Sequence, residues 1–132
     1  MAKPVVRAFP NRKISETFLE FAAPLLRDLP DDNLEQYVGQ ALQVAFMAWN
    51  AVIFSDGLND RWYLDEVRRL TANTPEATLL IEQMIARKCA LFGNDDRLIG
   101  TWELTRTEDG FNLRADARDP HSVPRESRKH IS

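Results

Sequence analysis

The chain contains few of the residues that usually carry catalysis or redox chemistry. Its 132 residues include one cysteine, Cys89, and two histidines, His121 and His130. A single cysteine excludes an internal disulfide, which fits the reducing cytoplasm. Both histidines follow the last predicted strand in a polar, proline-containing segment, whereas a general base needs fixed geometry. We therefore assign no catalytic role to them, and interpret Cys89 as a small buried thiol.

Motifs for phosphate or metal binding are also absent from the sequence. The five glycines are dispersed, so no glycine-rich phosphate loop is expected. Asp56, Asn59 and Asp60 surround a turn at Gly57, but their order differs from that of a calcium loop, and we interpret them as a capped turn. We predict no catalytic, cofactor-binding or metal-binding residues and no cofactor, and we favour a protein that is not an enzyme.

The N-terminal segment lacks a long apolar run and carries only basic charge. Val5 and Val6 alone are too short a run for a signal peptide, so we expect a cytoplasmic protein. In its general character the chain is similar to small bacterial cytoplasmic proteins. The whole chain has a net charge of −3, but this charge is unevenly distributed. Residues 1–13 carry four basic residues and no acid, whereas residues 14–118 carry 10 basic and 18 acidic residues. An acidic domain repels a phosphate backbone, so any nucleic-acid contact would have to come from the tails.

Charged residues are missing from the whole stretch between Gln36 and Ser55. This stretch would be apolar on nearly all sides of a helix, which is typical of a central helix in a bundle or of a membrane span. Spanning helices usually carry Lys or Arg at the cytoplasmic end, whereas both flanks here are acidic. We therefore predict a central helix and no membrane insertion; the flanking residues are Asp31, Asp32, Glu35, Asp56 and Asp60.

Apolar periodicity predicts the remaining elements. Spacings of three and four residues predict helices over about 15–29, 32–54, 59–72 and 75–92, the first of which either kinks or divides at Pro24. A period of two then predicts strands over about 97–106 and 111–118, joined at Asp109-Gly110.

These elements predict an α+β, mainly α fold. We expect about four helices in an antiparallel bundle, with a C-terminal two-stranded antiparallel β-hairpin whose apolar face packs on the helices. Residues 14–118 form the single globular domain, residues 1–13 a flexible basic arm, and residues 119–132 a flexible tail.

Asn50 is the unusual residue of the central helix, because it places an amide beside Trp49 in an apolar stretch. A buried amide needs hydrogen-bond partners. Asn50 either bonds a backbone carbonyl left by the kink at Pro24, or lines a small pocket between helices together with Tyr37 and Trp49.

Candidate interface residues lie on the third helix and on the hairpin. Trp62 falls on the polar side of its helix, where it either anchors an interface or folds onto a neighbouring loop. A two-stranded hairpin leaves two open edges that invite strand addition, so we add Trp102 and Phe111 to the possible interface.

Three functions follow from these features. The favoured hypothesis is a non-enzymatic interaction or assembly module, homodimeric through hairpins paired across a two-fold axis. The alternative is a small-molecule binder or enzyme with an interhelical pocket near Asn50. The second alternative is a regulator that contacts nucleic acid through its basic tails.

Overall fold

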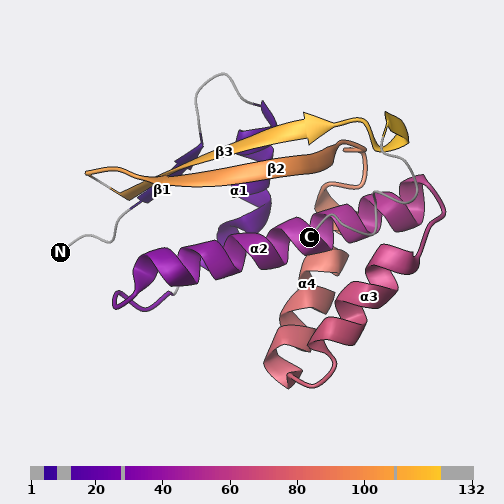
Figure 1. Ribbon diagram of the computed structural model, residues 1–132, viewed down its shortest axis with the longest axis horizontal. Helices are drawn as coiled ribbons and strands as arrows, with labels where there is room; N and C mark the ends of the chain where they lie inside the picture. The colour runs from indigo at the N-terminus through magenta and orange to yellow at the C-terminus, as the bar shows by residue number, and fades with distance from the viewer. Residues whose placement is uncertain (1–4, 9–12, 28, 109, 123–132) are drawn as a thin grey trace.

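A computed structural model describes residues 5–8, 13–27, 29–108 and 110–122 (Figure 1). The predicted class is confirmed, with four α-helices followed by a C-terminal antiparallel hairpin. The helices are α1 (Lys13–Leu26), α2 (Leu34–Val52), α3 (Trp62–Thr71) and α4 (Pro75–Leu91). The hairpin strands are β2 (Leu98–Arg106) and β3 (Gly110–Arg118), and the short turns η1 (Ile53–Gly57) and η2 (Pro120–Ser122) complete the order.

The hairpin gains a third strand from the N-terminal segment. Residues Val5–Ala8 form β1, which pairs in parallel with β3, so that the sheet order is β1-β3-β2. This differs from the predicted flexible arm over residues 1–13, of which residues 1–4 and 9–12 lie outside the described residues. Two consecutive valines favour a strand but are too short to show a period, so only the neighbouring β3 identifies the element.

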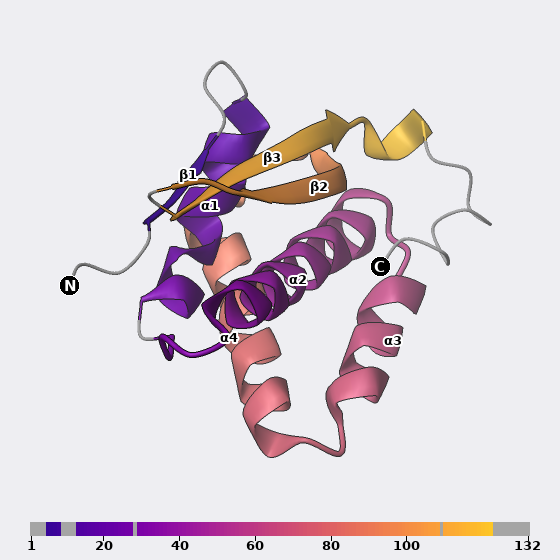
Figure 2. The same ribbon diagram turned by 60° about the vertical axis from the view of Figure 1, so that its left-hand side comes forward.

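The helices and the sheet form layers around α2 (Figure 2). Helices α1 and α2 contact the sheet, and α3 and α4 form a helical hairpin that packs on α2. By length and composition the stretch Leu34–Gly57 could cross a membrane, but 61% of its apolar window is buried inside the protein. The absence of charge in this helix is therefore matched by its place at the centre of the core, where Trp49 stacks edge-on against Phe21 and Phe92.

Helix α1 continues through Pro24 instead of dividing there. Proline has no backbone N–H, so the carbonyl of Glu20 lacks its usual helical donor. Arg87 of α4 supplies the missing donor, with its Nη2 2.9 Å from the Glu20 carbonyl and its Nε 3.0 Å from that of Phe21. At the position of the predicted break, a side chain from another helix thus bonds the carbonyl that proline leaves without a donor.

The other boundaries differ from the prediction by a few residues. Helix α3 begins at Trp62 instead of residue 59, because Asn59 adopts the left-handed conformation, with a φ of 52°. Arg61 takes the N-cap position, and the carboxylate of the preceding Asp60 accepts the Trp62 N–H at 3.1 Å. In the predicted C-terminal tail, Pro120 is buried within η2, and residues 123–132 lie outside the described residues.

Candidate functional site

Asn50 is fully buried and pairs with the backbone of strand β2. Its Nδ2 donates to the Ile99 carbonyl at 2.8 Å, and its Oδ1 accepts the Ile99 N–H at 3.0 Å. The amide therefore takes the place of one residue of an additional strand. The partner is not a carbonyl near Pro24, as one sequence-based alternative had it.

The structure does not form the predicted pocket of Asn50, Tyr37 and Trp49. Trp49 is buried, and its indole Nε1 donates to the Arg97 carbonyl at 2.7 Å. Tyr37 is half-buried and lies 13 residues before Asn50, which is about 20 Å along the helix axis. With both polar groups of Asn50 bonded to backbone, this amide offers no group to a ligand.

Lys88 of α4 adds a second buried polar contact at the start of β2. Its Nζ donates to the carbonyls of Phe92 at 2.6 Å and of Asp95 at 2.8 Å, and lies 4.3 Å from the centre of the Trp49 ring. The side chain is 1% exposed, and this burial lowers the pKa of Lys88. Periodicity could not identify it, since a lysine in the last turn of a helix is expected to be solvated.

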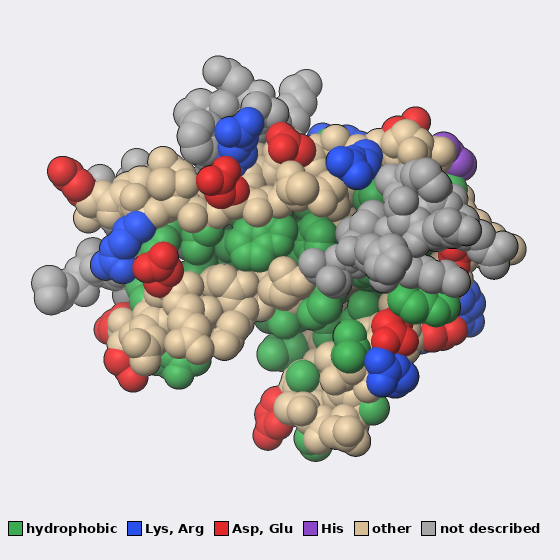
Figure 3. Space-filling model, viewed as in Figure 1, with side chains coloured by type: hydrophobic (Ala, Val, Ile, Leu, Met, Phe, Trp, Pro, Cys, Tyr) green, Lys and Arg blue, Asp and Glu red, His purple; other side chains and the backbone are tan. Residues whose placement is uncertain are grey.

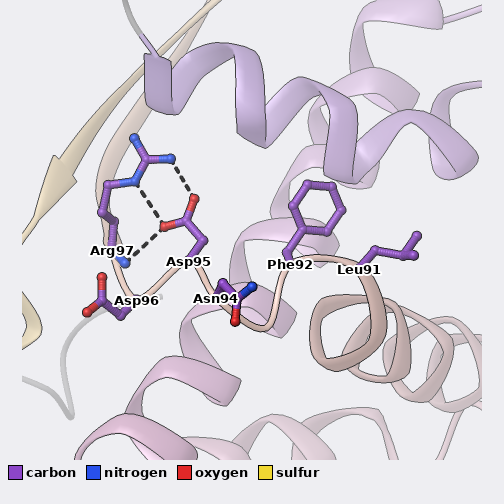
Figure 4. A pocket seen from close by; sticks show the side chains of 6 residues that line it. All are labelled: Leu91, Phe92, Asn94, Asp95, Asp96 and Arg97. Atoms are coloured by element: carbon purple, nitrogen blue, oxygen red, sulfur yellow. Dashed lines mark hydrogen bonds and ion pairs between the residues drawn. The ribbon is translucent and has the colours of Figure 1, made fainter.

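A surface cavity of 420 Å³ lies beside the loop that leads from α4 into β2, lined by Leu91, Phe92, Asn94, Asp95, Asp96 and Arg97 (Figure 4). The guanidinium of Arg97 faces the carboxylate of Asp95, with two hydrogen bonds of 2.9 and 2.5 Å. Burial of Asp95 would raise its pKa, but the hydrogen bonds from Arg97 outweigh burial and lower the pKa overall. Of the three charged side chains that line this cavity, Asp95 and Arg97 are therefore already paired with each other.

A second cavity, of 470 Å³, lies between η1 and the end of β3, and includes Asp96, Arg118 and His121. His121 is exposed, and its backbone N–H donates to Asp119 at 2.9 Å. Within the described residues, no group of three or more His, Cys, Asp or Glu side chains could hold a metal ion. Cys89 is exposed and 4.0 Å from Asp56, so the predicted burial of this thiol is wrong.

The predicted interface residues are not brought together. Trp62 is 41% exposed on α3, in the layer farthest from the sheet. Trp102 on β2 is half-buried, 6.2 Å from the Phe18 ring. Phe111 is only 2% exposed, so its prediction as an interface residue is wrong. It lies on the helix-facing side of the central strand, and Arg106 covers its ring at 5.7 Å.

A contact between Ser15 of α1 and strand β3 shows which backbone groups of the neighbouring strand β2 face away from the sheet. The Ala115 N–H donates to the Ser15 hydroxyl at 2.8 Å, and that hydroxyl lies 3.3 Å from the Ala115 carbonyl. The backbone of Ala115 therefore points away from its partner Trp102 on β2. In an antiparallel pair, two opposite residues direct their N–H and C=O groups either both toward the partner strand or both away from it, and these two kinds of position alternate. Trp102, Leu104 and Arg106 therefore all direct their N–H and C=O groups away from β3.

The stretch from Trp102 to Arg106 is thus an open strand edge. In the described part of the chain, neither a strand nor a side chain bonds to the outward N–H and C=O groups of Trp102, Leu104 and Arg106. Beside this edge, Figure 3 shows a band of apolar side chains exposed between β2 and the N-terminal half of α2. We call this feature, the outward backbone of residues 102–106, the open edge.

No family model, curated protein or solved structure matches this chain. The candidate site therefore rests on the geometry of this protein alone.

Proposed function

We propose that this protein is a non-enzymatic interaction module that binds an extended polypeptide segment along the open edge. The observation that carries the proposal is the row of outward backbone groups at Trp102, Leu104 and Arg106. Edge strands with such groups are templates for the addition of a strand, in which main-chain hydrogen bonds provide affinity and alternate side chains provide specificity.

The surface of α2 beside the open edge supports the proposal. Glu35, Gly39, Gln43 and Asn50 recur at helical spacing, so they lie on one side of α2. The two ends of this row contact β2, since Asn50 bonds Ile99 and Glu35 forms an ion pair of 3.6 Å with Arg106. Gly39 lies between them.

The glycine in this row has no role inside the protein. A Cβ added at Gly39 would meet no atom within 4 Å, so neither a turn nor close packing requires glycine there. Glycine within a helix costs about 1 kcal/mol relative to alanine. Open space at such a position leaves room on α2 for the side chains of an added strand.

A strand probe tests this function without knowledge of the natural partner. The probe is a capped peptide of alternating Thr and Val, titrated into the isotope-labelled full chain. We expect the amide signals of Trp102, Leu104 and Arg106 to shift together. The same peptide N-methylated at every residue should leave them unchanged, because neither of its edges then has main-chain donors. If the chain is monomeric at the concentration used, shifts confined to other regions, with these three amides unaffected, would contradict the proposal.

A further inference from the structure

We infer that the segment bound by the open edge is strand β2 of a second copy of this chain. The two β2 strands would run antiparallel about a two-fold axis at Leu104, joining two three-stranded sheets into one of six strands. This inference rests on the proposed function, since it names the partner of the same edge.

The extent of the open edge determines where the axis lies. Asn50 closes the edge at Ile99, and β2 ends at Arg106, so the outward groups between these limits belong to Trp102, Leu104 and Arg106. Leu104 is the midpoint of these three residues. A two-fold axis there pairs every outward group of one copy with one of the other, whereas an axis closer to Ile99 would bring the second strand against the Asn50 amide.

Charge is compatible with this register and disfavours two of the alternatives. With the axis at Leu104, Arg106 lies opposite Trp102 of the second copy, and Glu103 lies opposite Thr105 of the second copy. An axis at Glu103 would place two carboxylates opposite each other, and an axis at Arg106 would do so with two guanidinium groups. Like charges directly opposite each other destabilise a strand pair, whereas a guanidinium against an indole is attractive.

Side-chain burial fits this arrangement as well. Trp102 and Leu104 are half-buried on the helix-facing side of β2, and both belong to the rim of the hydrophobic core. In the paired sheet, Leu104 would contact Leu104 of the second copy on this side. The band of apolar side chains seen in Figure 3 would then be covered. The open space at Gly39 leaves room on α2 for side chains of the second copy.

The first test is sedimentation equilibrium of the full chain and of two variants at Leu104. Leu104→Pro removes an N–H that faces away from β3, so the hairpin should persist, since proline is tolerated on edge strands. We expect a wild-type dimer, a Leu104→Pro dissociation constant raised about 30-fold or more, and a Leu104→Val variant that still dimerises. A dimer that Leu104→Pro does not weaken would overturn the inference.

Disulfide trapping tests the register, and it decides the question if Leu104→Pro does not fold. In a Cys89→Ser background, Leu104→Cys should form a covalent dimer on oxidation, because opposite residues at such positions have Cα atoms about 5.5 Å apart. Thr101→Cys is the matched control, since its copies would lie about 20 Å apart. Equal trapping of both variants would overturn the register.

The two proposals fail in different ways. A wild-type chain that stays monomeric at high micromolar concentration, while the Thr-Val peptide still shifts the edge amides, overturns the homodimer and leaves the interaction module intact. A monomer with no response to the peptide overturns both. A dimer that Leu104→Pro dissociates supports both, whether or not the peptide competes.

Discussion

The two ends of strand β2 are held in opposite ways. At its start, Asn50 and Trp49 bond the backbone of Ile99 and Arg97, and buried Lys88 secures the preceding loop. At its far end the polar contact to α2 is an ion pair between Arg106 and Glu35, whose side chains are 66% and 61% exposed. Exposed ion pairs contribute about 0–1 kcal/mol. Buried polar side chains thus close the sheet at one end, whereas at the other end no side chain among the described residues bonds the outward backbone of residues 102–106.

Asn50→Leu should reduce the stability of the protein most, since it removes the side chain that bonds the start of β2. The change leaves the N–H and C=O of Ile99 buried without partners, so we expect a loss of about 3–5 kcal/mol in the free energy of unfolding, measured by urea denaturation. The matched control is Gln40→Leu, an exposed position of the same helix, which should change it by about 0.5 kcal/mol at most. Equal effects of the two variants would refute the structural role of Asn50.

Lys88→Met should be the next largest. It keeps the aliphatic volume but removes the donor to the Phe92 and Asp95 carbonyls, so we expect a loss of about 2 kcal/mol by the same measurement. Arg69→Met removes an exposed ion pair on the neighbouring helix and should cost about 0.5 kcal/mol or less. If Lys88→Met stabilises the protein, the cost of burying the ammonium exceeds the gain from its hydrogen bonds.

Ser15→Ala tests whether a buried side chain also stabilises the opposite edge of the hairpin, that of β3. The hydroxyl of Ser15 bonds the backbone of Ala115 where β1 no longer covers β3, and its loss should cost about 1–2 kcal/mol. Thr105→Ala, an exposed position on β2, should have an effect of about 0.5 kcal/mol or less, and both variants are measured by the same urea denaturation. A negligible effect of Ser15→Ala would show that water can replace this hydroxyl.

Low pH should reduce the stability of the protein through Asp95, in the loop that precedes β2. Its pKa is lowered in the folded state by Arg97, so as the pH falls the unfolded chain takes up the proton first. The stability from this pair is therefore complete above about pH 4 and is lost as the pH falls through the folded-state pKa. Asp95→Asn should cost about 1 kcal/mol at neutral pH and flatten the pH dependence of stability in acid. An unchanged acid slope would exclude Asp95 as its source.

Gly39→Ala should have the smallest effect, and of opposite sign. Nothing lies within 4 Å of the added Cβ, so the substitution should stabilise the protein by about 0.5–1 kcal/mol. Gly93→Ala is the matched control, because its Cβ would lie 2.8 Å from the Cys89 carbonyl and should destabilise the protein. If Gly39→Ala is destabilising, the space beside the open edge is not empty.

Sequence patterns predicted the elements that repeat a period many times. The four helices and the hairpin lie within a few residues of their predicted positions, and the charge-free stretch does form the central helix α2. Strand β1 escaped prediction because four residues contain too little periodicity. Phe111 was misplaced because its exposure depends on what covers the helix-facing side of β3, which a period of two does not specify.

Asn50 illustrates what remained for the tertiary structure to decide. The sequence alone determined that this amide would be buried in an apolar helix and would therefore need partners, because that follows from its neighbours along the chain. Only the tertiary structure decided that the partner is Ile99, on a strand 49 residues away, and that the open edge begins three residues beyond it. Hydrogen bonds between distant segments depend on how whole elements pack, and that information is not contained in any local pattern.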